Sequence, residues 1–72
     1  MSDLPPAVRA VLQAADAWAA AEEATAEWQR SVEGLLTHRQ IMDSPHLLEL
    51  CRRTHEAEKT LREAVRAWRQ AG

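Results

Sequence analysis

Apolar residues recur at seven-residue spacing through the first half of the chain, and this repeat limits the fold more than any other feature. One row of the repeat carries Leu4, Val11, Trp18, Thr25 and Val32, and the neighbouring row carries Ala7, Ala14, Ala21, Trp28, Leu35 and Met42. Two adjacent apolar rows are typical of the seam of a long amphipathic α-helix, as in coiled coils. A lone helix would leave this seam in water, so the chain needs a partner helix to cover it.

The signals for the first helix begin at Pro5 and Pro6, which suit a first helical turn because the N–H that proline lacks has no helical partner there. Alanines and glutamates, both strong helix formers, dominate residues 14–27. Gly34 is the one residue that argues against a continuous helix, since a glycine costs about 1 kcal/mol inside a helix and often caps the end of one. Leu35 and Met42 continue the apolar row beyond it. The sequence therefore favours one helix over about residues 6–42, with a break at Gly34 as the alternative.

The clearest turn signal is the segment Asp43-Ser44-Pro45. Ser44 is a good helix N-cap, and Pro45 suits the first position of a new helix while disfavouring helical geometry at Ser44. A second amphipathic helix is predicted over about residues 45–70. Its apolar rows are Leu47, Thr54, Leu61 and Trp68, and Leu50, Ala57, Ala64 and Ala71, with Cys51, Glu58 and Val65 beside them.

Two amphipathic helices joined by a short turn predict an all-α fold, an antiparallel two-helix hairpin that forms a single domain over residues 1–72. A pivot at Ser44 would bring Trp18 level with Trp68 and Trp28 close to Leu61. The acidic stretch 16–29 would then lie level with the basic stretch 59–72. The predicted core consists of Trp18, Trp28, Val32, Leu35, Leu47, Leu50, Leu61, Val65 and Trp68.

The first predicted helix exceeds the second by roughly 15 Å at 1.5 Å per residue, which leaves an uncovered overhang at its N-terminal end. A chain of 72 residues also supplies only a small core. We therefore expect two hairpins to pair as a homodimer in a four-helix bundle. The expected interface residues are Val8, Val11, Leu12, Trp18, Trp28, Cys51, Val65 and Trp68.

Composition and charge argue against several function classes. A net charge of −2 gives no bulk attraction to nucleic acid or anionic lipid. No apolar run approaches the roughly 20 residues of a membrane span, and the N-terminal residues lack the pattern of a signal peptide. The single Cys51 excludes a disulfide within the chain. From these features we predict a soluble, cytoplasmic protein without a membrane partner.

Cys51 and His55 are four residues apart and so share a helix face, as zinc-ligating pairs do. The pairs His46 with Glu49 and His55 with Glu58 reverse the Glu-x-x-His order of di-iron bundles. No Cys-x-x-Cys or His-x-x-x-His motif accompanies them. We therefore predict no metal and no cofactor, and keep as an alternative a metal-binding bundle that uses Cys51, His55 and nearby acids.

Six basic residues of the second helix suggest another alternative, a nucleic-acid-associated regulator. They are Arg52, Arg53, Lys59, Arg62, Arg66 and Arg69, but they spread over several helix faces and alternate with glutamates, which is typical of a solvated surface. Ser31, Ser44 and Thr54 have no base and acid at catalytic spacing. The sequence favours a non-enzymatic protein–protein interaction module, an adaptor, inhibitor or regulator that acts through helix faces on a partner protein it does not identify.

Overall fold

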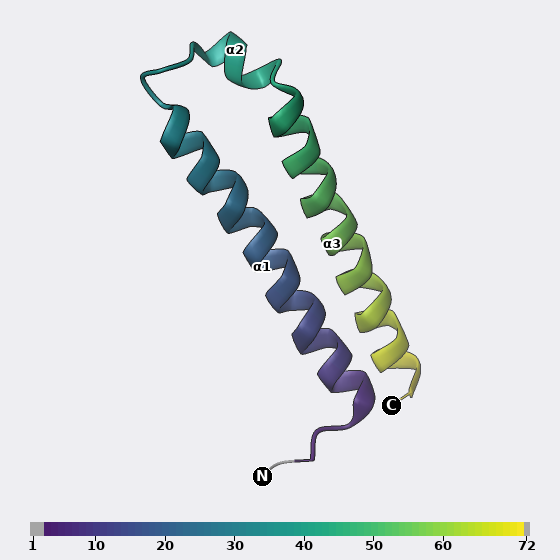
Figure 1. Ribbon diagram of the computed structural model, residues 1–72. Coiled ribbons are helices and arrows are strands. Elements are labelled where there is room, and N and C mark those ends of the chain that lie inside the picture. The colour runs from purple at the N-terminus through teal and green to yellow at the C-terminus, as the bar shows by residue number, and fades with distance from the viewer. Residues whose placement is uncertain (1–2, 72) are drawn as a thin grey trace.

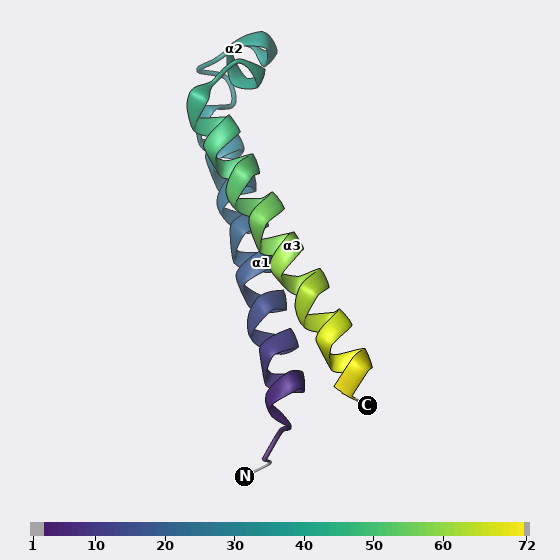
Figure 2. The same cartoon turned by 90° about the vertical axis from the view of Figure 1, so that its right-hand side faces the viewer.

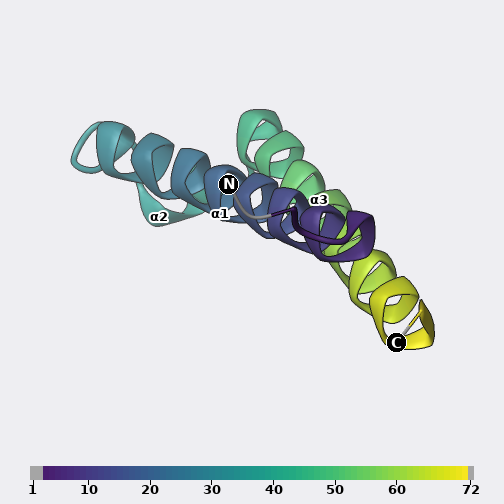
Figure 3. The ribbon, with the colours of Figure 1, turned by 90° about the horizontal axis from the view of Figure 1, so that it is seen from below.

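The computed structural model describes residues 3–71, and within them the chain is all-α, as predicted. Helix α1 spans Pro6–Val32, the short helix α2 spans His38–Met42, and α3 spans Pro45–Ala71. The two long helices lie side by side and run in opposite directions, with α2 at the end where the chain turns (Figures 1 and 2). Seen from below, α1 and α3 cross obliquely (Figure 3).

The first helix ends at Val32, so the predicted continuous helix over residues 6–42 is wrong. Gly34 has a φ of +83°, in the left-handed region that glycine enters without the steric cost that a side chain brings. The N–H groups of Leu35 and Leu36 donate to the Val32 carbonyl at 2.9 and 3.0 Å and close the helix end. Gly34 is therefore part of a C-terminal cap, and the break at Gly34 that the sequence left as the alternative is present.

Helix α2 begins with a capping box between Thr37 and Gln40. The Thr37 Oγ1 accepts the Gln40 N–H at 3.2 Å, and the Gln40 Oε1 accepts the Thr37 N–H at 2.8 Å. Each side chain thus satisfies one backbone donor that a new helix leaves unpaired. Together with Gly34, this box separates two helices where the apolar row alone favoured one.

The chain turns into α3 at Ser44. The Ser44 Oγ accepts the His46 N–H at 3.2 Å, and Pro45 is the first residue of the helix. This cap and this first residue are those that the sequence indicated for the second helix. Pro45 lacks an N–H and so leaves no unpaired donor at its position.

Helices α1 and α3 have the same length, 27 residues, or about 40 Å each, so the predicted overhang does not exist. The chain reverses around α2, near His38, because α1 ends early, and this moves the pivot away from Ser44. Trp28 therefore lies against His46, with ring centroids 5.2 Å apart, and not near Leu61. Val8 and Val11, expected on the overhang, are half-buried.

The core is small. Among residues 3–71 the buried hydrophobic side chains are Ala14, Leu47 and Leu50. Of the predicted core, Leu47 and Leu50 are thus confirmed, and the half-buried residues are Trp18, Trp28, Val32, Leu61 and Val65. The prediction is wrong for Leu35, which is 78% exposed, and for Trp68, which is 47% exposed. Leu35 lies in the turn after Gly34, where the helical periodicity that placed it in the core no longer applies.

Candidate functional site

An open groove of about 360 Å³ lies between α1 and α3. Its lining residues come from both helices: Glu22, Thr25, Ala26, Gln29, Cys51, Thr54, His55 and Glu58. Because α1 and α3 run in opposite directions, this lining places Glu22 level with Glu58. A turn centred on Ser44 would have placed Glu22 level with Arg66. The acidic part of α1 therefore lies beside a stretch of α3 that mixes both charges, which corrects the expected match of an acidic with a basic stretch.

Cys51 and His55, the candidate metal ligands, both line this groove, and Cys51 is exposed. Glu22 and Glu58 line it too, so the groove holds four side chains of ligand type. Within residues 3–71, however, there is no group of three or more His, Cys, Asp and Glu side chains placed to hold a metal ion. The geometry adds nothing to the metal-binding alternative that the sequence left open.

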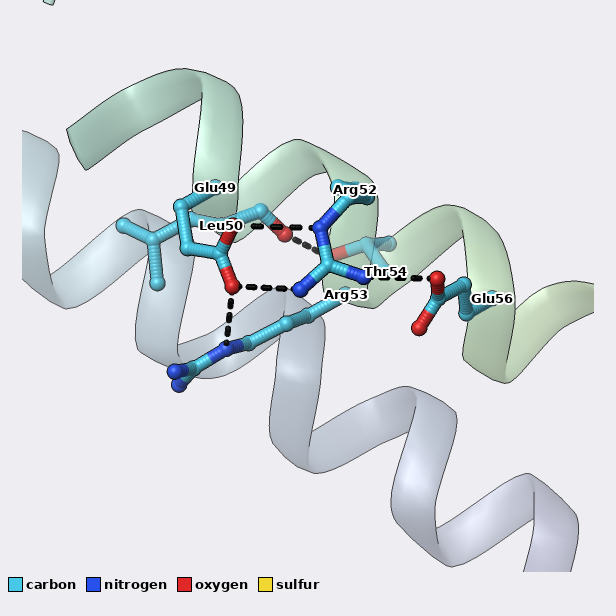
Figure 4. Close-up of polar contacts among 6 residues, drawn as sticks. All are labelled: Glu49, Leu50, Arg52, Arg53, Thr54 and Glu56. Atoms are coloured by element: carbon cyan, nitrogen blue, oxygen red, sulfur yellow. Dashed lines mark hydrogen bonds and ion pairs between the residues drawn. The ribbon is translucent and has the colours of Figure 1, made fainter. Parts of the chain in front are cut away.

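The basic residues at the start of α3 belong to an ion-pair ladder along that helix (Figure 4). The Arg52 guanidinium donates to both carboxylate oxygens of Glu49, at 2.6 and 3.1 Å, and to Glu56 Oε1 at 2.6 Å. Arg53 Nε donates to Glu49 Oε1 at 3.4 Å. Further along, Arg62 donates to Glu58 at 2.5 Å. Three of the arginines considered for nucleic acid are therefore already paired with acids of their own helix.

These hydrogen bonds shift two pKa values. The hydrogen bond from Arg52 is the largest effect and lowers the pKa of Glu49. Desolvation, the next largest, opposes it, and the charge of Arg52 and the contact with Arg53 add to the lowering. The bond to Glu49 and the charges of Glu49 and Glu56 raise the pKa of Arg52. All the side chains involved are well exposed, so water screens the pairs and each contributes little to folding stability.

The hydroxyl groups considered as nucleophiles take part in local backbone hydrogen bonds. Ser31 Oγ donates to the Trp28 carbonyl at 2.7 Å, and Thr54 Oγ1 donates to the Leu50 carbonyl at 3.1 Å. Ser44 Oγ accepts the His46 N–H as the cap of α3. Ser31 and Ser44 thus lie at the end of α1 and the start of α3, and Thr54 bonds to the preceding turn inside α3.

The predicted interface residues fall into two groups. The half-buried group is Val8, Val11, Trp18, Trp28 and Val65, and the exposed group is Leu12, Cys51 and Trp68. The indole Nε1 of Trp18 is buried without a hydrogen-bond partner among residues 3–71. An exposed Leu48, at 64%, adds an apolar side chain that the sequence pattern did not place in any interface. Because Leu48 follows Leu47 by one residue, its side chain is turned away from the side of α3 that packs on α1.

None of the helices that the structure describes combines the length and the apolar character needed to cross a membrane. Comparisons with protein-family models, with curated proteins and with solved structures each give no match for this chain. The fold of residues 3–71 places this chain in the class of small all-α proteins.

Proposed function

We propose that this chain is a small non-enzymatic protein–protein interaction module. It forms an antiparallel helical hairpin, pairs with a second copy in a four-helix bundle, and presents the remaining helix faces to a partner protein as an adaptor, inhibitor or regulator. The observation that carries the proposal is the excess of surface that a single copy leaves in water.

One copy has an accessible surface of 5806 Å² at a mass of 8.1 kDa. A compact monomer of that mass would expose about 4,500 Å². The radius of gyration is 16.1 Å, where a compact chain of this length would have about 11 Å. The principal extents of 48 × 25 × 12 Å describe a layer one helix thick, so neither broad face is covered by another element of the described chain.

Dimerisation would remove the excess of accessible surface. A compact protein of twice the mass would expose about 7,400 Å², so forming it from two copies would bury roughly 2,000 Å² of each. Obligate homodimers bury areas of this size, and their interfaces resemble a domain core cut in half. The apolar side chains that a single copy exposes, Leu12 among them, can form part of such an interface.

Two features that reduce the folding stability of a single copy support the same proposal. Three buried hydrophobic residues among residues 3–71 form a very small core for two 27-residue helices. The unpartnered Trp18 Nε1 adds a desolvation cost of about 1–3 kcal/mol. Binding of the folded chain to a second copy would offset such costs by mass action.

Equilibrium sedimentation of the unmodified chain tests the proposal. We expect a dimer mass at tens of micromolar, and a melting temperature that rises with protein concentration because association binds the folded form. Leu12→Asp should shift the equilibrium toward monomer, since an aspartate at that exposed apolar position would be desolvated in the dimer. Gln13→Asp, an exposed neighbour on a different side of α1, is the matched control. A monomer mass for the unmodified chain would overturn the proposal.

A further inference from the structure

The side of the two-helix layer on which the groove opens, called here the groove face, continues beyond the groove along both helices. On α1 the groove residues Glu22, Ala26 and Gln29 are preceded at helical spacing by Ala19, Ala15, Leu12 and Val8. On α3 the groove residues Cys51, His55 and Glu58 are followed by Arg62, Val65, Arg66 and Arg69, which line a second hollow together with Leu61. The groove face thus runs from the acidic groove to the free ends of α1 and α3.

Charge is distributed unevenly along this face. Glu22 and Glu58 stand at one level in the groove, one on each helix. Arg66 and Arg69 lie about 12 and 16 Å further along α3, at 1.5 Å per residue. Within residues 3–71, neither of these two arginines takes part in an ion pair, whereas Arg62 is bound to Glu58. The face therefore has an acidic middle and a basic end whose charges lack partners in the described chain.

Two copies can stack groove face on groove face about a two-fold axis in either of two directions. An axis parallel to the helices would place α1 of each copy on α3 of the other at the same level. Glu22 would then face Glu58 of the second copy, and four carboxylates would meet at the centre. Like charges brought together in an interface oppose binding.

An axis across the helices instead places α1 on α1 and α3 on α3, each pair antiparallel. With the axis between Arg62 and Val65, the basic end of one copy reaches the level of Glu58 and Glu22 of the other. This axis passes within about 10 Å of the middle of α3, so most of each helix remains covered. Opposite charges then coincide twice, once on each side of the axis.

The apolar side chains of the groove face fit this second arrangement. Level with the axis, α1 presents the small residues Ala15 and Ala19, which allow two helices to approach closely. Leu12, 54% exposed in a single copy, lies one turn before Ala15 and would lie between Ala19 and Glu22 of the second copy. The centre of the interface is then apolar on α1, whereas on α3 Arg62 and Arg66 lie near the axis and Glu58 of the same chain offsets the charge of Arg62.

We infer that the groove face binds a second copy of this chain in the antiparallel, α1-on-α1 and α3-on-α3 arrangement, in which the partner's Arg66 and Arg69 bind Glu58 and Glu22. This inference rests on the proposed self-association and adds the face, the direction of the two-fold axis and the charged residues that fix the register.

A charge-exchange experiment tests it. Glu58→Lys in one chain and Arg66→Glu with Arg69→Glu in another each place like charges against each other in a homodimer. We expect each variant alone to raise the dimer dissociation constant about tenfold or more in equilibrium sedimentation at low salt. Mixed in equal amounts, the two variants should form a heterodimer that binds more tightly than either homodimer, because one charge contact is then native and in the other the charges at positions 58, 66 and 69 are exchanged. Native mass spectrometry identifies the heterodimer by its mass.

Glu56→Lys is the matched control, since Glu56 also loses an ion pair within α3, to Arg52, but lies on a different side of the helix. We expect it to leave dimerisation within about twofold of the unmodified chain. A dimer that is insensitive to Glu58→Lys, equally sensitive to Glu56→Lys, or not rescued by mixing would overturn the groove-face arrangement while leaving self-association intact. A monomeric unmodified chain would overturn both. Rescue in the mixture also excludes misfolding as the cause of weakened binding.

Discussion

Trp28 of α1 and His46 of α3 pack against each other, with ring centroids 5.2 Å apart and ring planes tilted by 58°. The contact joins the last turns of α1 to the first turn of α3, next to the segment that contains Gly34 and α2. It fixes how far α3 is shifted along α1, because a one-turn slip would move the rings about 5 Å apart along the axis.

Replacing Trp28 with Ala should lower the free energy of unfolding by about 2 kcal/mol. The value is below the 3–5 kcal/mol of a fully buried tryptophan because Trp28 is only half-buried. Urea unfolding followed by circular dichroism measures the change. Trp68→Ala is the control, because Trp68 is 47% exposed and should cost less. A larger loss for Trp68 than for Trp28 would contradict this packing.

Leu47 and Leu48 are adjacent residues with opposite environments, 5% and 64% exposed. Leu47→Ala removes a side chain from the small core and should destabilise the fold by about 2–5 kcal/mol. Leu48→Ala should change stability by less than about 0.5 kcal/mol. Chemical denaturation of the two variants at one protein concentration gives the comparison. Similar losses for both would mean that α3 is rotated about its axis relative to the structure.

Gly34→Ala should destabilise the chain by about 1–2 kcal/mol, because a side chain at a φ of +83° clashes with its own backbone. The space around Gly34 is open, so no contact with other residues adds to this cost. Gly34→Asn should lose less, since asparagine tolerates the left-handed region better. Thermal melts of the three chains check the order. A more stable Gly34→Ala variant would indicate that α1 and α2 can merge into one helix.

Stability should depend on pH through Glu49. Its pKa lies below the ordinary value of 4.5 in the folded chain, so the carboxylate favours folding above that pH, and this contribution is lost as the pH falls through the folded-state pKa. Glu49→Gln removes the charge that Arg52 binds. We expect the unmodified chain to melt at a higher temperature than Glu49→Gln at pH 7.

The difference should shrink toward pH 3, and added salt should also reduce it because the pair is exposed. Glu23→Gln, an exposed change on α1, serves as the control for loss of one negative charge. Equal melting temperatures of the unmodified chain and Glu49→Gln across this pH range would contradict the role assigned to the Arg52 contact.

The sequence by itself determined the all-α class, the start of α3 at Pro45 and the burial of Leu47 and Leu50. Each of these depends on local chemistry or on periodicity within one helix: proline lacks an N–H, serine caps a helix, and apolar residues at helical spacing share a face. The capping box of Thr37 and Gln40 was also present in the sequence, and with Gly34 it could have located the end of α1.

Only the tertiary structure decided the register of the two long helices. The apolar rows continue past Gly34 and fit either a single long helix or two, because a seven-residue repeat describes which residues share a face and not where the chain turns back. Because α1 ends at Val32, the chain turns back near His38 and not at Ser44. As a result Trp28 contacts His46, and Glu22 lies level with Glu58. The groove and its charges follow from that shift, since the pairing of residues across two helices depends on the length and geometry of the connection between them.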